Sequence, residues 1–264
     1  MSAPAAAKLP QELIAGGLEA ASASIECVVG RAALFSTPCF EGEANQDGAL
    51  FIERDGRVVL AVADGVGGLP GGASASASAL RALADAIEKG AAVEDAFEDA
   101  NEAVRTLAGP ATTLVVAELV KVDGRVRLRT YNAGDSQAAI IGGRGKLKGI
   151  TMPHSIVGHA QEADMLTAED VATHPLRHLV TNVLGDATLR LDRTTWPLLA
   201  KRDTVLLASD GLWDNVSEEE IVSIARQGSV DEALDELARR ARAAMESGEE
   251  GTKLDDLTIV LWRR

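Results

Sequence analysis

The stretch that decides the fold is Arg57-Val-Val-Leu-Ala-Val-Ala-Asp64-Gly65, an apolar run that ends in an aspartate and a glycine. Two later runs end in the same way, Tyr131-Asn-Ala-Gly-Asp135-Ser136 and Leu206-Leu-Ala-Ser-Asp210-Gly211. Aspartate is a poor strand former and a good turn former, so each residue taken alone is explained as an ordinary turn. Together the three runs predict β-strands whose ends carry carboxylates.

Other β-rich runs lie close together and are separated by turn signals such as Asp55-Gly56 and Asp123-Gly124. This spacing is typical of antiparallel hairpins. The predicted strands are 49–53, 57–63, 111–120, 125–132, 138–141, 204–208 and 257–262. The basic segment 142–148 directly follows the predicted strand 138–141. It is predicted to be a solvated hairpin tip, and a phosphopeptide-docking patch is the alternative.

Helices interrupt the strands in two pairs. The first pair is predicted at 72–89 and 93–107, and apolar residues of the second segment recur at helical spacing. The second pair is expected to begin at Ser217 and Ser229, because a glutamate follows each serine by three residues, as in a capping box. Strands, a helix pair, strands and another helix pair predict an α+β fold of packed sheets flanked by helices.

Composition limits the possible functions. The 264 residues carry a net charge of −14 and are 46% hydrophobic. The negative charge disfavours nucleic-acid and anionic membrane partners, since both bind through Lys and Arg. No run is long enough for a membrane helix, and Cys27 and Cys39 are too few for a disulfide framework. We therefore expect a cytoplasmic protein with reduced cysteines, although one disulfide between the two remains an alternative.

No repeat or linker divides the chain, so we expect a single domain over residues 24–264. Residues 1–23 are rich in Ala and Ser and are predicted to form a mobile leader or a short cap.

Two more aspartates, Asp47 and Asp255, precede the first and last of the strands that we predict. Strand ends of packed sheets can converge on one rim, where several carboxylates repel one another unless a cation keeps them ionised. Oxygen ligands without Cys or His suit Mg²⁺ or Mn²⁺ and do not suit zinc. Two such ions could activate a bridging water and neutralise a phosphoryl group. The residues therefore indicate metal-assisted phosphate hydrolysis.

A series of motifs runs along the chain from Asn45 to the C-terminus. They are Asn45-Gln46-Asp47, Ala63-Asp64-Gly65-Val66-Gly67-Gly68, Gly109-Pro-Ala-Thr112-Thr113, Ala133-Gly134-Asp135-Ser136, His174-Pro175 with Leu184-Gly185, Ala208-Ser209-Asp210-Gly211-Leu212 and Asp255-Asp256-Leu257-Thr258. Each is weak alone, but in this order they resemble the type 2C (metal-dependent, PPM) serine/threonine protein phosphatases, particularly compact bacterial members.

This resemblance implies a four-layer α-β-β-α sandwich of two antiparallel sheets flanked by helix pairs. It implies hydrolysis of phosphoserine and phosphothreonine by a water activated between two Mg²⁺ or Mn²⁺ ions, with a third, weaker ion site. The implied catalytic residues are Asp47, Asp64 and Asp210. The implied metal-binding residues are Asp47, through bound water, Asp64, the carbonyl of Gly65, Asp135 at the third site, Asp210 and Asp255.

The resemblance also implies a flap at residues 156–173 and phosphorylated proteins as partners, among them substrates of a Ser/Thr kinase. We expect the chain to act as a monomer.

The chain departs from the family's pattern in several places. Gly42 stands where the family has an arginine that holds the substrate phosphate, and Arg31 is the nearest upstream cation that a shifted loop could deliver. Gln46 replaces a common Glu, Val66 replaces a histidine of some members, and Pro153 replaces the aspartate that usually precedes the residue at His154.

These departures keep a second hypothesis open, a pseudophosphatase that binds a phosphoprotein or kinase partner with little catalysis. The retained aspartates favour an active enzyme, because a protein without catalysis has no reason to keep a self-repelling cluster. A third hypothesis is a phosphatase that regulates an anti-sigma-factor antagonist pathway, which differs from the first only in its partner.

Overall fold

The fold is organised around β5 (Arg57–Val66), a strand that is covered on both faces. Val59, Ala61 and Ala63 point to one core, whereas Val58, Leu60 and Val62 point to another. Because successive side chains of a strand alternate between its faces, a strand buried on both sides reads as a continuous apolar run. This is why the sequence around β5 is so uniformly aliphatic.

The computed structural model describes residues 11–15, 17–66, 71–163, 165–167, 170, 174–176, 179–249 and 251–264. Within them the strands form two antiparallel sheets, in the orders β1-β4-β5-β7-β8-β11, with β6 paired to β5, and β10-β9-β12-β13-β3-β2. The strands are β1 Gln11–Ala15, β2 Ala21–Cys27, β3 Gly30–Thr37, β4 Asp47–Arg54, β5, β6 Ala111–Thr112, β7 Leu114–Val122, β8 Arg125–Ala133, β9 Gln137–Gly142, β10 Lys146–Ile150, β11 Asp192–Thr195, β12 Thr204–Ala208 and β13 Leu257–Arg263. The helices are α1 Gly72–Glu88, α2 Val93–Arg105, α3 Ile156–Glu162, α5 Asp210–Trp213, α6 Glu218–Ala225 and α7 Val230–Ser247.

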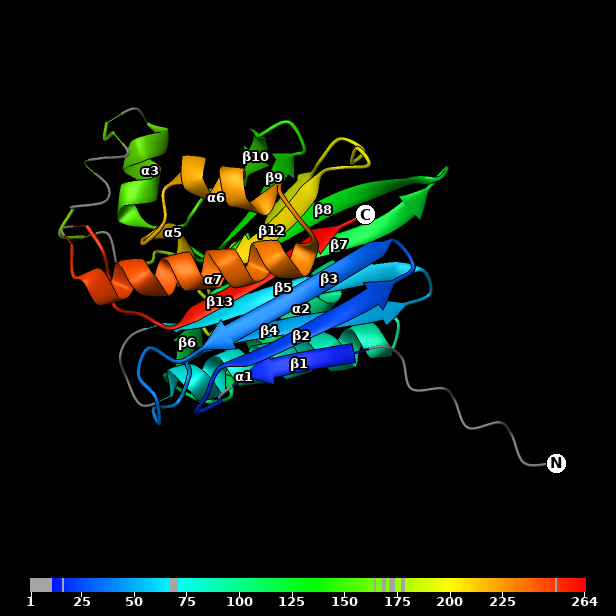
Figure 1. Ribbon diagram of the computed structural model, residues 1–264. Coiled ribbons are helices and arrows are strands. Elements are labelled where there is room, and N and C mark those ends of the chain that lie inside the picture. Colours follow the sequence, from blue (N-terminus) through cyan, green and yellow to red (C-terminus); the bar gives the residue numbers. More distant parts are fainter. Residues whose placement is uncertain are drawn as a thin grey trace.

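Three apolar cores separate four layers. One core joins α1 and α2 to the first sheet, a second lies between the sheets, and a third joins the second sheet to α5, α6 and α7. Figure 1 shows the helix pairs α1/α2 and α6/α7 on opposite outer sides of the two sheets. The predicted α+β sandwich of antiparallel sheets is thus confirmed.

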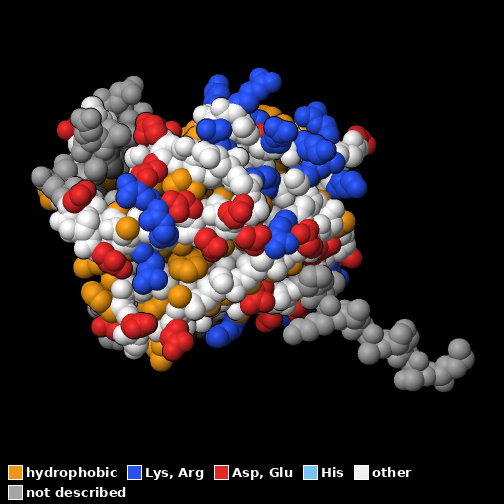
Figure 2. Space-filling model, in the orientation of Figure 1, with side chains coloured by type: hydrophobic (Ala, Val, Ile, Leu, Met, Phe, Trp, Pro, Cys, Tyr) orange, Lys and Arg blue, Asp and Glu red, His pale blue; other side chains and the backbone are white. Residues whose placement is uncertain are grey.

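Most predicted elements match the structure to within a few residues. The run predicted at 111–120 is divided into β6 and β7 at Thr113, whose side chain serves the site described below. Residues 142–148 form the predicted hairpin between β9 and β10. Figure 2 shows Lys and Arg side chains gathered where β9 and β10 lie, and Arg144 and Lys146 are both exposed there.

Residues 1–23 were predicted to form a mobile leader or a short cap. For the described residues of this range, the prediction of a mobile leader was wrong. β1 pairs with β4, and β2 pairs with β3, so these residues form one edge of each sheet. In β2 small residues alternate, with Ala21, Ala23 and Ile25 packed against the core between the sheets. Residues 1–10 and 16 lie outside the described residues.

Two smaller expectations concern the cysteines and the membrane. Cys27 and Cys39 are free thiols that are half-buried, and burial raises the pKa of both. In the described part of the chain, none of the helices combines the length and apolarity needed to cross a membrane.

The two predicted capping boxes differ. At α7 the box is complete: Ser229 Oγ accepts from Glu232 N, and the Glu232 carboxylate accepts from Ser229 N at 2.8 Å. At α6, Ser217 Oγ accepts from Glu220 N at 3.3 Å, but the Glu220 carboxylate pairs with Arg240. The prediction of a reciprocal box at Ser217 was therefore wrong, because a competing cation takes the glutamate.

We expect Ser229→Ala to lower the free energy of unfolding by about 1 kcal/mol, since it removes the two hydrogen bonds of the Ser229 hydroxyl in the capping box of α7, at 3.0 and 3.2 Å. Ser217→Ala is the matched control and should cost less, because only one longer hydrogen bond is lost. Urea unfolding of both variants measures the difference. Equal losses would contradict the assignment of the complete box to α7 alone.

Candidate active site

The ends of both sheets meet at one cavity of about 420 Å³. Asp64, near the end of β5, is the register partner of Asp47 at the start of β4. Asp210 follows β12, and Asp255 precedes β13, the strand paired with β12. The cavity is lined by Gln46, Asp64, Gly65, Val66, Asp135, Val180, Asp210, Lys253, Leu254, Asp255 and Asp256. Four of the five predicted aspartates therefore share one cavity.

The backbone at Asp64 is fixed by two threonines. Asp64 N donates to Thr113 Oγ1 at 3.1 Å, and Asp64 O accepts from Thr113 N at 2.7 Å and from Thr112 Oγ1 at 2.8 Å. Thr113 Oγ1 also lies 2.7 Å from Ser136 Oγ, next to Asp135. These bonds place the Asp64 and Asp135 segments against each other.

Gly65 allows a close approach between β5 and the start of α1. A Cβ atom at Gly65 would lie 2.4 Å from the carbonyl carbon of Gly72. A Cβ atom at Gly72 would lie 2.1 Å from Gln46 Oε1. Neither position can carry a larger side chain without moving the wall of the cavity. Gly67 and Gly68 of the same motif lie outside the described residues.

Asp47 lies behind the cavity and does not line it. Its side chain is buried, and Ser209 Oγ donates to Asp47 Oδ2 at 2.6 Å. Asn45 Oδ1 accepts from Asp47 N at 2.9 Å. The structure thus brings Asp47 next to Asp64, but only Asp64 lines the cavity.

The sequence analysis assigned no role to Asp256, although this residue belongs to the last of the motifs. Asp256 Oδ1 accepts from Cys39 N and Asp256 Oδ2 accepts from Gln46 N, both at 2.6 Å. One carboxylate therefore holds the loop before β4 against the start of β13. An acidic pair just before a strand, Asp255-Asp256, was the signal available in the sequence.

The buried carboxylates oppose one another electrostatically. Burial raises the pKa of Asp64 well above its usual range, and the charges of Asp47, Asp210, Asp255 and Asp135 raise it further. Burial also raises the pKa of Asp47, although the hydrogen bond from Ser209 opposes this shift.

The two carboxylates on the other side of the cavity show the same effect. Burial and the charge of Asp210 raise the pKa of Asp135 to about 8 and that of Asp255 to about 6. A cation in the cavity would reverse these shifts, because it favours the ionised forms.

The donor set fits a hard divalent cation. Asp210 Oδ1 is buried and has no hydrogen-bond partner, so it offers a free carboxylate oxygen inside the cavity. Its other oxygen, Asp210 Oδ2, accepts from Lys253 Nζ at 2.6 Å, and Asp255 Oδ2 lies 2.5 Å from the same nitrogen. As they stand, no three acidic, His or Cys side chains of the described residues are arranged to hold a metal ion. The Lys253 ammonium lies between two of the expected ligands, Asp210 and Asp255.

The departures from the family pattern are also visible. Gly42 has φ 84° in an exposed loop, a conformation that costs about 1–2 kcal/mol for most other residues. Arg31 lies at the opposite end of β3 from Thr37, about 20 Å from it at the usual rise of a strand. Its guanidinium pairs with Asp231 at 2.8 Å and Glu26 at 2.5 Å. The suggestion that a shifted loop delivers Arg31 was therefore wrong.

Gln46 is part of the cavity wall. Gln46 O accepts from Gly65 N at 3.0 Å, and Gln46 Oε1 is buried without a hydrogen-bond partner. The side-chain oxygen thus remains available to a ligand in the cavity. Val66 lines the same cavity and cannot transfer a proton.

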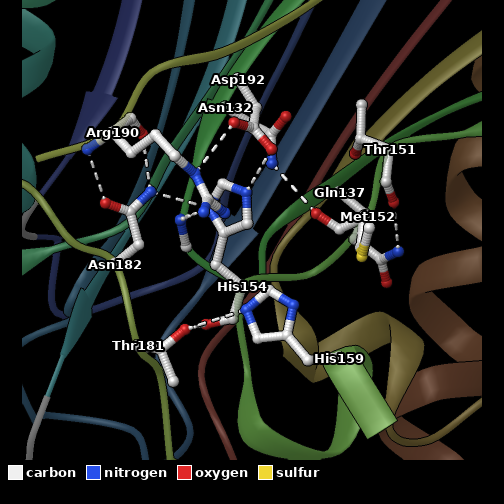
Figure 3. A network of polar contacts seen from close by, with 11 residues as sticks. Asn132, Gln137, Thr151, Met152, His154, His159, Thr181, Asn182, Arg190 and Asp192 are labelled. Carbon is white, nitrogen blue, oxygen red and sulfur yellow. Dashed lines mark hydrogen bonds and ion pairs between the residues drawn. The ribbon is translucent and has the colours of Figure 1, made fainter. Parts of the chain in front are cut away.

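A second polar network lies behind Asp135 and centres on His154, whose side chain is fully buried (Figure 3). Gly134 N and Asn182 Nδ2 approach His154 Nδ1 at 3.2 and 2.9 Å. A backbone N–H can only donate, so Nδ1 accepts, and the ring proton lies on Nε2, 2.9 Å from Asp192 Oδ2. The neutral ring therefore ties the residue before Asp135 to the segment 182–192. Burial lowers the pKa of His154, which favours this neutral form.

The flap predicted at 156–173 begins with the helix α3. Thr181 N and Oγ1 both donate to His154 O, at 2.7 and 3.0 Å, so the segment after the flap is anchored to the same network. Residues 164, 168, 169 and 171–173 lie outside the described residues, and the flap stays a prediction.

Comparison with known proteins agrees with this geometry. Residues 40–250 match the model of the family described as protein phosphatase 2C. The chain is 30% identical over 240 residues to the serine/threonine phosphatase stp of Listeria welshimeri, over 83% of this chain and 90% of that protein. It is 27% identical over 226 residues to the protein phosphatase PhpP of Streptococcus pneumoniae, over 80% of this chain and 87% of that protein.

Comparison with solved structures gives the same family and the same fold. The serine/threonine phosphatase PstP/Ppp of Mycobacterium tuberculosis matches with a TM-score of 0.72 and 27% identity, over 89% of this chain and 98% of that chain. The PstP catalytic domain in complex with 2 manganese ions matches with a TM-score of 0.72 and 25% identity, over the same shares of the two chains. The expected family and sandwich fold are thereby confirmed.

The raised pKa of Asp135 predicts how the metal-free protein responds to pH. An unfolded aspartate titrates near pH 3.9, so between about pH 4 and 8 the folded state holds a proton that the unfolded state releases. Stability therefore falls as the pH rises through this range. In EDTA at pH 8.5, we expect the free energy of unfolding of Asp135→Asn to exceed that of wild type by more than about 1 kcal/mol. At pH 5 this gain in stability should be smaller.

Thermal and urea unfolding at both pH values measure this gain. Asp123→Asn is the control, since Asp123 is exposed in the β7–β8 turn, where asparagine tolerates its φ of 49°. A gain for Asp135→Asn that does not depend on pH would contradict the assignment.

The lowered pKa of His154 predicts the opposite pH dependence. Below about pH 6.5 the unfolded chain binds a proton that the buried ring does not, so stability is lost as the pH falls. His154→Gln should cost about 2 kcal/mol at pH 7.5 through lost hydrogen bonds, and the difference from wild type should narrow at pH 5. His159→Gln, which alters the ring stacked on His154, is the control. A constant difference for His154→Gln would show that the pKa of His154 is the same in the folded and unfolded states.

Proposed function

Because the chain belongs to the protein phosphatase 2C family, we propose that it is a metal-dependent enzyme that hydrolyses phosphoserine and phosphothreonine in proteins. The chain is a protein serine/threonine phosphatase, as its named relatives are. The observation that carries the metal-dependent part is the single cavity onto which Asp64, Asp135, Asp210 and Asp255 open.

Two Mg²⁺ or Mn²⁺ ions would lower the pKa of an attacking water and neutralise charge on the phosphoryl group. We assign Asp64, the Gly65 carbonyl, Asp210 and Asp255 to these ions, and Asp135 to a third, weaker ion. Asp47 supports them from below, oriented by Ser209. Of the described residues that line the cavity, none but Lys253 carries a positive charge, so acidic residues dominate this part of its wall.

The proposed substrates are proteins phosphorylated by a Ser/Thr kinase. The net charge of −14 and the free cysteines support a cytoplasmic enzyme without nucleic-acid or membrane partners, and we expect a monomer. The structure of the PstP catalytic domain in complex with 2 manganese ions supports Mn²⁺ as the first metal to test.

We expect turnover of a phosphothreonine peptide and a small aryl phosphate with Mn²⁺ or Mg²⁺ and none in excess EDTA. Asp210→Asn should lower kcat/KM by more than about 100-fold, because it removes a charged ligand from the cavity. Asp123→Asn, an exposed turn variant, should keep wild-type kinetics.

Both substrates are measured with each metal and with EDTA. Absence of turnover in a folded protein that still binds the phosphopeptide would overturn the proposal and leave a pseudophosphatase. Turnover that survives EDTA and Asp210→Asn would overturn the metal-dependent mechanism.

A further inference from the structure

Lys253 lies at the centre of the acidic cavity, although the sequence offered no reason to select it. Its Nζ atom contacts Asp210 Oδ2 at 2.6 Å and Asp255 Oδ2 at 2.5 Å. Burial alone would lower the pKa of Lys253, but the two carboxylates raise it above its usual value. The side chain of Lys253 is 27% exposed, and it lines the cavity.

The backbone of Lys253 is fixed by one side chain. Lys253 N donates to Asn215 Oδ1 at 2.9 Å, and Asn215 Nδ2 donates to Lys253 O at 2.9 Å. Asn215 Nδ2 also donates to Gly211 O at 3.0 Å, directly after Asp210. The lysine backbone is therefore held at a set position beside Asp210, and only its flexible four-carbon stem is left to move.

A divalent cation and the Lys253 ammonium compete for the same two carboxylates, those of Asp210 and Asp255. The ammonium now takes one oxygen each from Asp210 and Asp255, two of the ligands assigned to the metal ions. Two positive charges within a few ångströms repel each other. Metal binding must therefore release the ammonium from these carboxylates. Since its backbone stays fixed, the released side chain remains at the cavity.

Among the described residues, the cavity offers no arginine as a partner for a phosphoryl group. Gly42 stands where an arginine was expected, and Arg31 is held at the far end of β3 by Asp231 and Glu26. Among the described residues that line the cavity, Lys253 is the single cation. Lysine is a common phosphate ligand that acts as a point charge on a long stem.

We propose that Lys253 is the phosphate-binding residue of this enzyme and that it exchanges partners. In the metal-free protein its ammonium holds Asp210 and Asp255 together. When metal ions take these carboxylates, the ammonium binds a non-bridging oxygen of the substrate phosphoryl group in place of the missing arginine. This inference rests on the proposed metal-dependent phosphatase activity.

The test compares the full chain with Lys253→Met, Lys253→Arg and Lys148→Met. Lys148 is the matched control, because its ammonium also pairs with a carboxylate, Asp203 at 2.7 Å, but lies outside the cavity lining. Calorimetry measures Mn²⁺ binding to each metal-free protein, and inorganic phosphate binding to each Mg²⁺-loaded protein. Steady-state kinetics with a phosphothreonine peptide give kcat and KM separately, and thermal unfolding checks the fold of each variant.

We expect Lys253→Met to bind Mn²⁺ about tenfold more tightly, because no ammonium competes for the carboxylates. It should bind inorganic phosphate about tenfold more weakly and raise KM by a similar factor at saturating metal, with kcat changed less. Lys253→Arg should restore phosphate binding and KM, and Lys148→Met should match wild type in both calorimetric measurements.

Wild-type affinities for both Mn²⁺ and phosphate in Lys253→Met would overturn the inference. A rise in KM that Lys253→Arg does not rescue would also overturn it, since the residue would then act only on structure. The two calorimetric measurements need no turnover. A wild-type protein without activity would therefore refute the proposed function while the role of Lys253 in metal and phosphate binding is still decided.

Discussion

The structure depends on placing several carboxylates within one buried rim, where burial and the charges of neighbouring acids raise the pKa of Asp64, Asp135 and Asp255. Asp64 and Asp47 face each other across β4 and β5, and Asp210 and Asp255 come from neighbouring strands of the other sheet. Such a cluster opposes folding at neutral pH unless positive charge enters it. The two sheets must therefore be stable enough from their apolar cores to tolerate the repulsion at their ends. This explains why so many side chains of β5 and β12 are aliphatic and fully buried.

Hydrogen bonds beneath the rim keep the carboxylates in position despite their repulsion. Ser209 Oγ donates to Asp47 and accepts from Thr258 N at 3.1 Å, and Thr258 Oγ1 lies 2.6 Å from Ser36 Oγ. On the other side, His154 and its partners fix the residue before Asp135. Because the Ser209 hydroxyl and the His154 ring are neutral, they orient the acids without cancelling their charge. The charge of the cavity is thus left for ligands to satisfy.

The central elements were predictable from sequence, and the edges were not. Strands that are covered on both faces, such as β5, have a continuous aliphatic sequence. No other secondary structure accounts for such a run as well. The edge strand β2 uses alternating Ala and Ser, so its period of two is present but its hydrophobic signal is weak. The grouping of Asp47, Asp64, Asp135, Asp210 and Asp255 followed from strand ends and the family resemblance. Which aspartate lines the cavity and which lies behind it depends on packing between the sheets, which the sequence does not encode locally.

The position of Lys253 could not be predicted, because a lysine two residues from an aspartate usually points to solvent. Here Asn215 turns its backbone toward the end of β12, and the stem then reaches Asp210. An arginine on the loop at Gly42 would bind phosphate whether or not metal were present. A lysine on the same segment as a metal ligand cannot bind phosphate in the absence of metal. Its ammonium is free only after another cation has bound the carboxylates. If Lys253 binds the phosphate, substrate affinity in this enzyme therefore depends on prior metal loading, and the order of binding follows from charge balance within one cavity.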